Sequence, residues 1–173
     1  QQRLRRAVAA RERAEIDATE FAATERAAVD EVVHEQEHAG VDVVTDGQIR
    51  CYDPISHVMG ALDGVRINGL LRYFDTNFYF RQPVVRAAVK RRAPIACADF
   101  EMASLAARVP VKPVLPGPYT LARLSIIESG AYASVAALAH AISDALAAEV
   151  AELAHAGAQV MQIEEPAIVQ HPE

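Results

Sequence analysis

Two stretches far apart in this chain share one design: a helix-forming segment, the tripeptide His-Ala-Gly, a short apolar run and then acidic residues. One reads EHAGVDVVTDG and the other reads AHAGAQVMQIEE. Glycine commonly ends a helix, and a short apolar run directly after it is typical of a buried strand. Between the two, the run VKPVL ends in Pro-Gly-Pro. Helix–strand units with short connections predict an α/β fold whose parallel strands are apolar on both faces.

Three apolar runs are expected to form neighbouring parallel strands: residues 41–45, 111–115 and 159–163. In parallel α/β folds the carboxyl ends of the strands line the active site. Asp46 and Glu164 follow two of these runs, so we expect both to lie at that end of the sheet. The adjacent carboxylates Glu164 and Glu165 have two interpretations, a site mouth that meets a cationic group or a solvated strand end that caps a helix.

Helices are predicted by composition and by end signals. Residues 3–13 are rich in Arg, Ala and Glu, which are good helix formers. A second helix is expected over 24–39, with Gly40 as its end. Ser134 is a plausible N-cap for a long helix that ends at Gly157.

The stretch NGLLRYFDTNFYFRQPVV holds half of the aromatic residues of the chain. Its apolar alternation is interrupted by Asp75, Thr76 and Asn77, which favours a hairpin outside the main sheet. The aromatic side chains are expected to form a small local core, and a lid over a substrate is the alternative. On the lid interpretation, Asp75 and Asn77 are candidate site-lining residues.

The charge balance excludes some partners. The chain of 173 residues has a formal net charge of −6, whereas nucleic-acid binding needs clustered Lys and Arg. No apolar run approaches the ~20 residues of a membrane span. The chain has two cysteines, Cys51 and Cys97, and their spacing matches no metal-ligand motif. This cysteine usage is typical of a protein in a reducing compartment and predicts no metal site within the chain. We therefore expect a cytoplasmic protein with neither a nucleic-acid nor a membrane partner.

Four segments together resemble the catalytic domain of the cobalamin-independent methionine synthase family: VVTDGQIRCYDP, DTNFYFRQPVV, VKPVLPGPYTLARLS and GAQVMQIEEPAI. The resemblance runs from about Val29 onward, and PGPYTL with IEEPA is its most specific combination. It implies methyl transfer to the zinc-bound thiolate of homocysteine, which yields methionine. The implied fold is a (β/α)8 TIM barrel.

A complete barrel needs about 250 residues. Residues 1–173 are therefore expected to be an incomplete barrel domain, an internal piece that lacks the first strand and the carboxyl-terminal half. The resemblance places the zinc ligands, a His-x-Cys pair, a Glu and a second Cys, beyond Glu173. We expect the chain alone to hold no zinc and to be inactive.

The resemblance assigns substrate-binding residues. Glu164 aligns with a carboxylate, usually Asp, that binds the amino group of homocysteine or methionine, and Gln48 aligns with a Glu that also contacts the amino acid. Asp46 is the third candidate. Charge-assisted hydrogen bonds suit an ammonium group. Glu165 is expected to brace the turn, and Tyr119 and Glu165 are candidate site-lining residues. No catalytic residue is identified.

The methyl donor is inferred from departures within the resemblance. Phe78 and Tyr79 stand where folate-using members carry an Arg-Cys pair that binds polyglutamyl folate, and Leu124 stands where they carry a Trp that stacks on the pterin. The loss of these contacts favours a methylcorrinoid or corrinoid protein over methyltetrahydrofolate. In this the chain is most similar to the short single-domain members of the family.

Two other functions stay open. One is a uroporphyrinogen-decarboxylase-like methyltransferase that acts on a corrinoid or on another thiol such as coenzyme M. The other is a non-catalytic barrel remnant. A His-x-Cys pair after the next strand separates enzymes from a remnant, and an ammonium-binding Glu164 separates homocysteine from coenzyme M, which carries a sulfonate.

Overall fold

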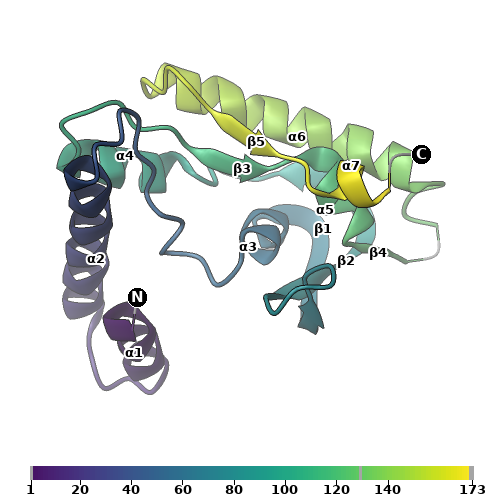
Figure 1. Ribbon diagram of the computed structural model, residues 1–173. Helices are drawn as coiled ribbons and strands as arrows, with labels where there is room; N and C mark the ends of the chain where they lie inside the picture. Colours follow the sequence, from purple (N-terminus) through teal and green to yellow (C-terminus); the bar gives the residue numbers. More distant parts are fainter. Residues whose placement is uncertain (1, 129, 172–173) are drawn as a thin grey trace.

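Three segments pair in parallel in the computed structural model, which describes residues 2–128 and 130–171 (Figure 1). Val44 forms a parallel bridge with Val111. Strand β3 (Val114–Pro116) pairs in parallel with β5 (Gln162–Glu164). The predicted parallel neighbours are therefore confirmed, with the segment 111–116 in the middle.

The ladders are shorter than predicted, because proline interrupts the central segment. Pro110 and Pro113 lack an N–H and can only accept hydrogen bonds. Their carbonyl groups accept from Val44 N at 3.0 Å and from Gln162 N at 2.9 Å. The segment 41–45 therefore contributes one bridge at Val44 rather than a full strand.

The expectation of strands buried on both faces is wrong for the last strand. Val160 is 51% exposed and Ile163 is 46% exposed. Pro116 of β3 pairs with Glu164 on one side of β5. Along its other edge, no strand of the described part of the chain pairs with β5.

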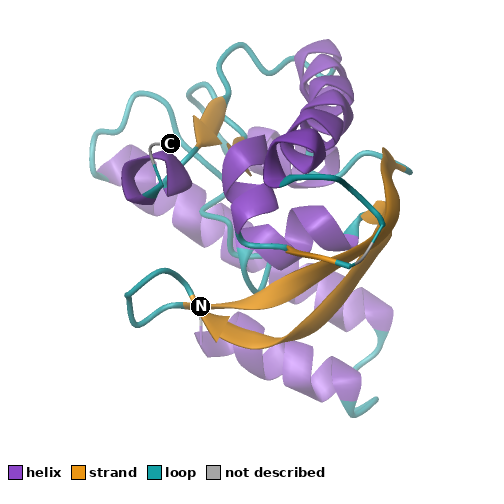
Figure 2. Ribbon diagram, turned by 90° about the vertical axis from the view of Figure 1, so that its right-hand side faces the viewer, coloured by secondary structure: helices purple, strands orange, loops and turns teal. Residues whose placement is uncertain are grey.

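A long antiparallel hairpin lies outside these three segments, as predicted. Strands β1 (Leu62–Arg72) and β2 (Tyr79–Arg91) run side by side (Figure 2). The turn between them contains the interrupting polar residues and is closed by Tyr73 N donating to Phe78 O at 2.7 Å. Strand β4 (Ile126–Ile127) adds to β2 in parallel.

Some aromatic residues of this hairpin form a small cluster at its turn. Phe80 is buried, and the Tyr73 ring makes edge contacts with Phe74 and Phe80. Phe78 and Tyr79 are 75% and 55% exposed. The local core predicted from the sequence is thus built from only part of the aromatic set.

The predicted helices form, and their end signals operate as expected. Helix α2 (Ala18–His38) is followed by Gly40 at φ +79°, and α6 (Val135–His155) is followed by Gly157 at φ +105°. Ser134 caps α6, since its side chain accepts from Ala137 N at 3.1 Å. The remaining helices are α1 (Gln2–Glu12), α3 (Pro54–Gly60), α4 (Cys97–Ala106), α5 (Pro118–Arg123) and α7 (Ala167–Gln170).

Helix α6 lies along the parallel segments and supplies much of the core (Figure 1). Leu138, Ile142 and Leu153 are fully buried on it, and each such side chain contributes about 1.5–3 kcal/mol of transfer free energy. None of the helices in the described residues is long and apolar enough to cross a membrane.

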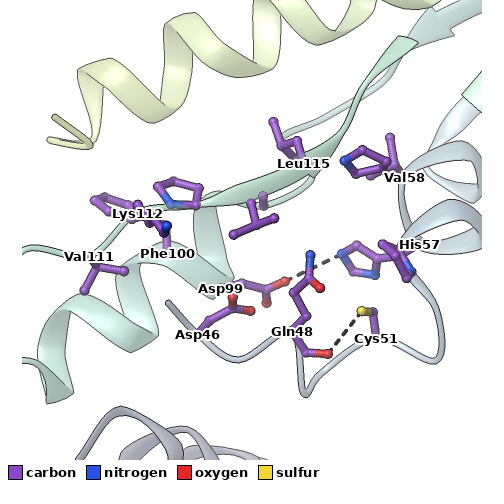
Figure 3. Close-up of a pocket in the computed structure, with 15 residues that line it drawn as sticks. Asp46, Gln48, Cys51, His57, Val58, Asp99, Phe100, Val111, Lys112 and Leu115 are labelled. Carbon is purple, nitrogen blue, oxygen red and sulfur yellow. Dashed lines mark hydrogen bonds and ion pairs between the residues drawn. The ribbon is translucent and has the colours of Figure 1, made fainter. Parts of the chain in front are cut away.

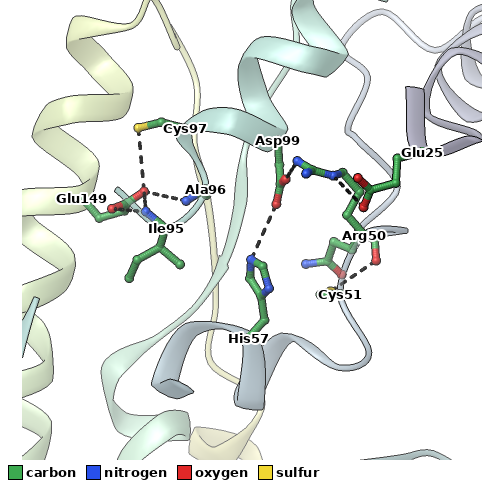
Figure 4. A network of polar contacts seen from close by, with 10 residues as sticks. Glu25, Arg50, Cys51, His57, Ile95, Ala96, Cys97, Asp99 and Glu149 are labelled. Atoms are coloured by element: carbon green, nitrogen blue, oxygen red, sulfur yellow. Dashed lines mark hydrogen bonds and ion pairs between the residues drawn. The ribbon is translucent and has the colours of Figure 1, made fainter. Parts of the chain in front are cut away.

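A buried carboxylate fastens α6 to the chain ahead of α4 (Figure 4). Glu149 on α6 has 0% exposure. Its carboxylate accepts from Ile95 N at 2.9 Å and from Ala96 N at 2.7 Å, and it pairs with Arg91 Nε at 2.8 Å. These hydrogen bonds compensate the carboxylate for its lost hydration.

Candidate active site

A small cavity lies where the loop after Val44 meets α3, α4 and the segment 111–116 (Figure 3). Its volume is about 30 Å³, which is room for one small polar group such as a water molecule. Its lining includes these polar side chains: Asp46, Gln48, Cys51, His57, Asp99 and Lys112. The structure thus brings two of the three predicted substrate-binding residues, Asp46 and Gln48, to one cavity.

The loop that carries Asp46 and Gln48 has an unusual backbone. Gly47 has φ +69° and Gln48 has φ +50°, both in the left-handed region, which is uncommon for a residue other than glycine. A Cβ on Gly47 would also lie 2.8 Å from the Val32 side chain. Glycine is required at 47 for both reasons.

Helix α2 fixes the start of this loop through one glutamine. Gln36 Nε2 donates to Thr45 O at 2.8 Å, and Thr45 N donates to Gln36 Oε1 at 2.9 Å. A side-chain amide therefore takes the place of a neighbouring strand at the residue where the chain leaves the parallel segments.

Asp46 is half-buried, and none of the described residues forms an ion pair with its carboxylate. Burial raises the pKa of the Asp46 carboxyl and the charge of Asp99 adds to the rise, while the Gln48 backbone N–H and the nearby His57 lower it in part. A carboxylate in this state is stabilised by a cation.

The sequence did not reveal a polar network around Asp99 (Figure 4). Asp99 and Asp46 line the same cavity (Figure 3). Arg50 pairs with Glu25 at 3.4 Å and also with Asp99. His57 Nε2 lies 3.6 Å from Asp99 Oδ2 and, within the described part of the chain, makes no hydrogen bond. These residues are isolated in the sequence, so no motif marks them.

Helix α3, which carries His57, does have a sequence signal. Asp53 precedes Pro54, a pairing typical of a helix N-cap followed by its first residue. The Asp53 carboxylate accepts from Ser56 N at 2.6 Å and from Arg81 N at 3.0 Å. It therefore starts α3 and ties it to β2.

Cys51 lines the cavity as a neutral thiol. Burial raises its pKa to about 12, and the charges of Asp46, Asp99 and Asp53 add to the rise. Its Sγ donates to Gln48 O at 3.3 Å. Because the thiolate is the reactive form, Cys51 is a weak nucleophile.

The two adjacent carboxylates at the end of β5 have different surroundings. Glu165 accepts from Tyr119 N at 2.9 Å, from Thr120 N at 2.7 Å and from Thr120 Oγ1 at 2.6 Å. It therefore braces the start of α5. Glu164 is exposed and contacts Gln162 Nε2 at 2.7 Å.

The other predicted site residues lie elsewhere. Asp75 has a 98% exposed side chain beside Arg72 in the hairpin turn, and Asn77 is exposed in the same turn. Tyr119 donates its hydroxyl to His171 O at 2.8 Å.

Three comparisons with known proteins identify the kind of domain. A model of the "Cobalamin-independent synthase, Catalytic domain" family matches residues 1–171, so the likeness begins well before Val29. The methionine synthase of Sulfurisphaera tokodaii is 36% identical over 145 residues, 83% of this chain and 42% of that protein. The 5-methyltetrahydropteroyltriglutamate–homocysteine methyltransferase of Halalkalibacterium halodurans is 29% identical over 89% of this chain and 20% of that protein.

A solved structure agrees with these relatives. The B12-independent methionine synthase from Shewanella sp. W3-18-1, in complex with selenomethionine, superposes with a TM-score of 0.76 at 25% identity. The match covers 88% of this chain and 45% of that one. This chain thus spans about two fifths of the Sulfurisphaera relative and one fifth of the Halalkalibacterium one. It belongs to the cobalamin-independent methionine synthase family, within the catalytic domain.

Proposed function

We propose that this chain is part of a homocysteine S-methyltransferase of the methionine synthase type, and that it supplies the amino-acid end of the active site. The observation that carries the proposal is the Asp46 carboxylate, which lines a cavity beside Gln48 and forms no ion pair with any of the described residues. Homocysteine carries an ammonium group that would complete this site. The names of the relatives support the same substrate.

The chemistry of the cavity suits an ammonium group. The cavity admits one small polar group, so the α-ammonium would enter while the rest of the amino acid stays in front of it. Asp46 offers a charged acceptor and Gln48 a neutral one. Hydrogen bonds to charged groups contribute about 1.5–3 kcal/mol each, so Asp46 would dominate the affinity.

Glu164 is proposed as a second acceptor. It lies at the carboxyl end of β5, in register with Pro116, and Pro116 lines the cavity. Its exposed carboxylate leaves it accessible to a ligand. Glu165, which is occupied by the start of α5, would position this strand end rather than contact the amino acid.

The proposed architecture is part of a (β/α)8 barrel. The parallel segments with polar residues at their carboxyl ends support it, as does the overlap with the longer Shewanella structure. The exposed apolar face of β5 would then be covered by the rest of the barrel. We call this chain together with that remainder the complete polypeptide.

The zinc that the family implies does not fit the described residues. They contain no group of three or more His, Cys, Asp or Glu side chains placed to hold a metal ion. We therefore propose that the ligands belong to the remainder of the complete polypeptide.

We propose a methylated folate as the methyl donor, on the basis of the names of the relatives. The Halalkalibacterium protein is named for a methyltetrahydropteroyltriglutamate donor, and the names give the corrinoid preference inferred from Phe78 and Tyr79 no support. A donor assay with both methylated folate and methylcobalamin separates the two sources.

Calorimetry on the complete polypeptide tests the substrate. We expect homocysteine to bind and coenzyme M, which has no ammonium group, to bind far more weakly. Glu164→Gln should weaken homocysteine binding by about 1.5–3 kcal/mol and leave the zinc content unchanged, whereas Glu165→Gln should change the affinity less. Equal affinity of parent and Glu164→Gln would make Glu164 a solvated strand end, and absence of homocysteine binding by the parent would refute the proposed function.

A further inference from the structure

Asp99 is the point where three elements around the cavity are joined. It lies on α4, while its partner Arg50 lies at the end of the loop that carries Asp46. The other partner, His57, lies on α3. Arg50 also reaches Glu25 on α2. One carboxylate therefore connects α3, α4 and the loop, and Arg50 extends the connection to α2 (Figure 4).

The network is shielded enough to hold a geometry. The side chains of Arg50 and Asp99 are 21% and 15% exposed, and that of Glu25 is 14% exposed. Exposed ion pairs contribute little because water and salt screen them. Partly buried pairs with several partners are screened less, and the planar guanidinium fixes directions as well as distances.

The loop needs such an anchor. Its two left-handed residues, Gly47 and Gln48, lie between two tethers, Thr45 on Gln36 and Arg50 on Asp99. The left-handed conformation is unfavourable for Gln48 and persists only where the surroundings impose it. If the Arg50 tether is released, Gln48 is free to return to an ordinary backbone conformation, and its side chain leaves the cavity.

Asp99 is itself poorly placed to take a ligand. Its Oδ1 is engaged by Arg50 and its Oδ2 faces His57. Asp46, on the other hand, has no ion-pair partner in residues 2–128 and 130–171. The Asp99 carboxylate is therefore occupied by protein groups, whereas the Asp46 carboxylate is available to a ligand.

We infer that Asp99 is a positioning residue for amino-acid binding: through Arg50 and His57 it sets where Asp46 and Gln48 stand in the cavity. This inference rests on the proposed function for the identity of the ligand. The position of the loop itself depends only on the contacts described above.

The test compares Asp99→Asn with Glu101→Gln in the complete polypeptide. Glu101 is an exposed carboxylate on the same helix, so it controls for the loss of one charge from α4. We expect Asp99→Asn to bind homocysteine about 10- to 100-fold more weakly, by analogy with the loss caused by changing residues that orient metal ligands. Backbone amides 46–50 should exchange hydrogen faster, and Glu101→Gln should change neither quantity.

A second variant separates a positioning effect of the network from a general loss of folded structure. Arg50→Lys keeps the charge but loses the fork of donors, so it should show an intermediate loss of affinity and intermediate exchange. A merely structural role for Asp99 would lower the unfolding temperature and leave the affinity of the folded protein unchanged. An unchanged affinity of folded Asp99→Asn for homocysteine would overturn the inference.

The two readouts separate this inference from the proposed function. If the parent does not bind homocysteine, the proposed function fails, and the exchange of amides 46–50 still decides whether Asp99 holds the loop. If the parent binds homocysteine and Asp99→Asn binds it equally well, the positioning role fails and the proposed function stands.

Discussion

Glu165→Gln should destabilise the protein, because the Glu165 carboxylate is the hydrogen-bond acceptor for the start of α5. It accepts from two backbone N–H groups, those of Tyr119 and Thr120, and from the Thr120 hydroxyl, at 2.6–2.9 Å. Thr120 is fully buried, and its Oγ1 accepts in turn from Ala167 N at 3.2 Å. The carboxylate therefore joins the end of β5 to both α5 and α7.

The size of the effect follows from what glutamine can replace. A glutamine side chain offers one acceptor oxygen, and its amide nitrogen cannot accept from an N–H group. At least one backbone donor loses its partner, and the bonds that remain lose their charge. A hydrogen bond to a charged group contributes about 1.5–3 kcal/mol, so we expect a loss of about 2–3 kcal/mol. The unfolding temperature of the complete polypeptide should therefore fall.

The loss of stability is measured by thermal unfolding of the complete polypeptide, monitored by circular dichroism. Glu164→Gln is the matched control, since it removes the same charge from the neighbouring residue, and its side chain is exposed. Exposed substitutions usually change stability by less than about 0.5 kcal/mol. An unfolding temperature for Glu165→Gln within about 1 °C of the parent, or an equal fall for both variants, would refute the assignment of Glu165 as the brace of α5.

Three further outcomes are expected. Glu149→Gln should destabilise the protein by about 3 kcal/mol in urea unfolding, because Arg91, whose side chain is 12% exposed, loses its buried charged partner. A loss of stability below about 1 kcal/mol would contradict this expectation. Asp46 has a raised pKa, so its contribution to stability is fully present at acidic pH and is lost as the pH rises through that pKa. The gain in stability of Asp46→Asn over the parent should therefore increase with pH in the acidic range and level off near neutrality, and a pH-independent difference would contradict the raised pKa. With a pKa of about 12, Cys51 should react with iodoacetamide at pH 8 about a thousandfold more slowly than an ordinary thiol, which peptide mass spectrometry measures against the urea-unfolded protein.

Local signals predicted the elements well. Gly40 and Gly157 end their helices, and Ser134 starts α6, because each acts on the backbone within a few residues. The parallel direction of the apolar runs was also predictable, since helix–strand repeats impose it. The length of the strands was not predictable. Pro113 limits the pairing of the central segment, and how far it does so depends on which strand lies beside that segment.

The candidate site was predictable only in its loop. Asp46 and Gln48 follow an apolar run directly, so strand-end reasoning finds them. Asp99 and His57 come from two helices whose approach to that loop is fixed by tertiary packing, and a single Asp or His in a helical stretch carries no signal of its own. The burial of Ile163 in the last strand was overestimated. The sequence shows that a strand is apolar, but it does not show which face of the strand is covered.

The residue at position 48 connects the electrostatics of the cavity to its selectivity. The resemblance to the family places a Glu there, where this chain has Gln48. A second carboxylate next to Asp46 would raise the pKa of Asp46 beyond the rise that burial and Asp99 already cause. A neutral Gln48 lets Asp46 ionise more readily and still offers an acceptor oxygen to the same ammonium group. Since Arg50 is shared by Glu25 and Asp99, Asp46 is the carboxylate of the cavity lining that has no ion-pair partner among the described residues. The neutral substitution therefore concentrates the attraction for a cation on Asp46 instead of removing it from the site.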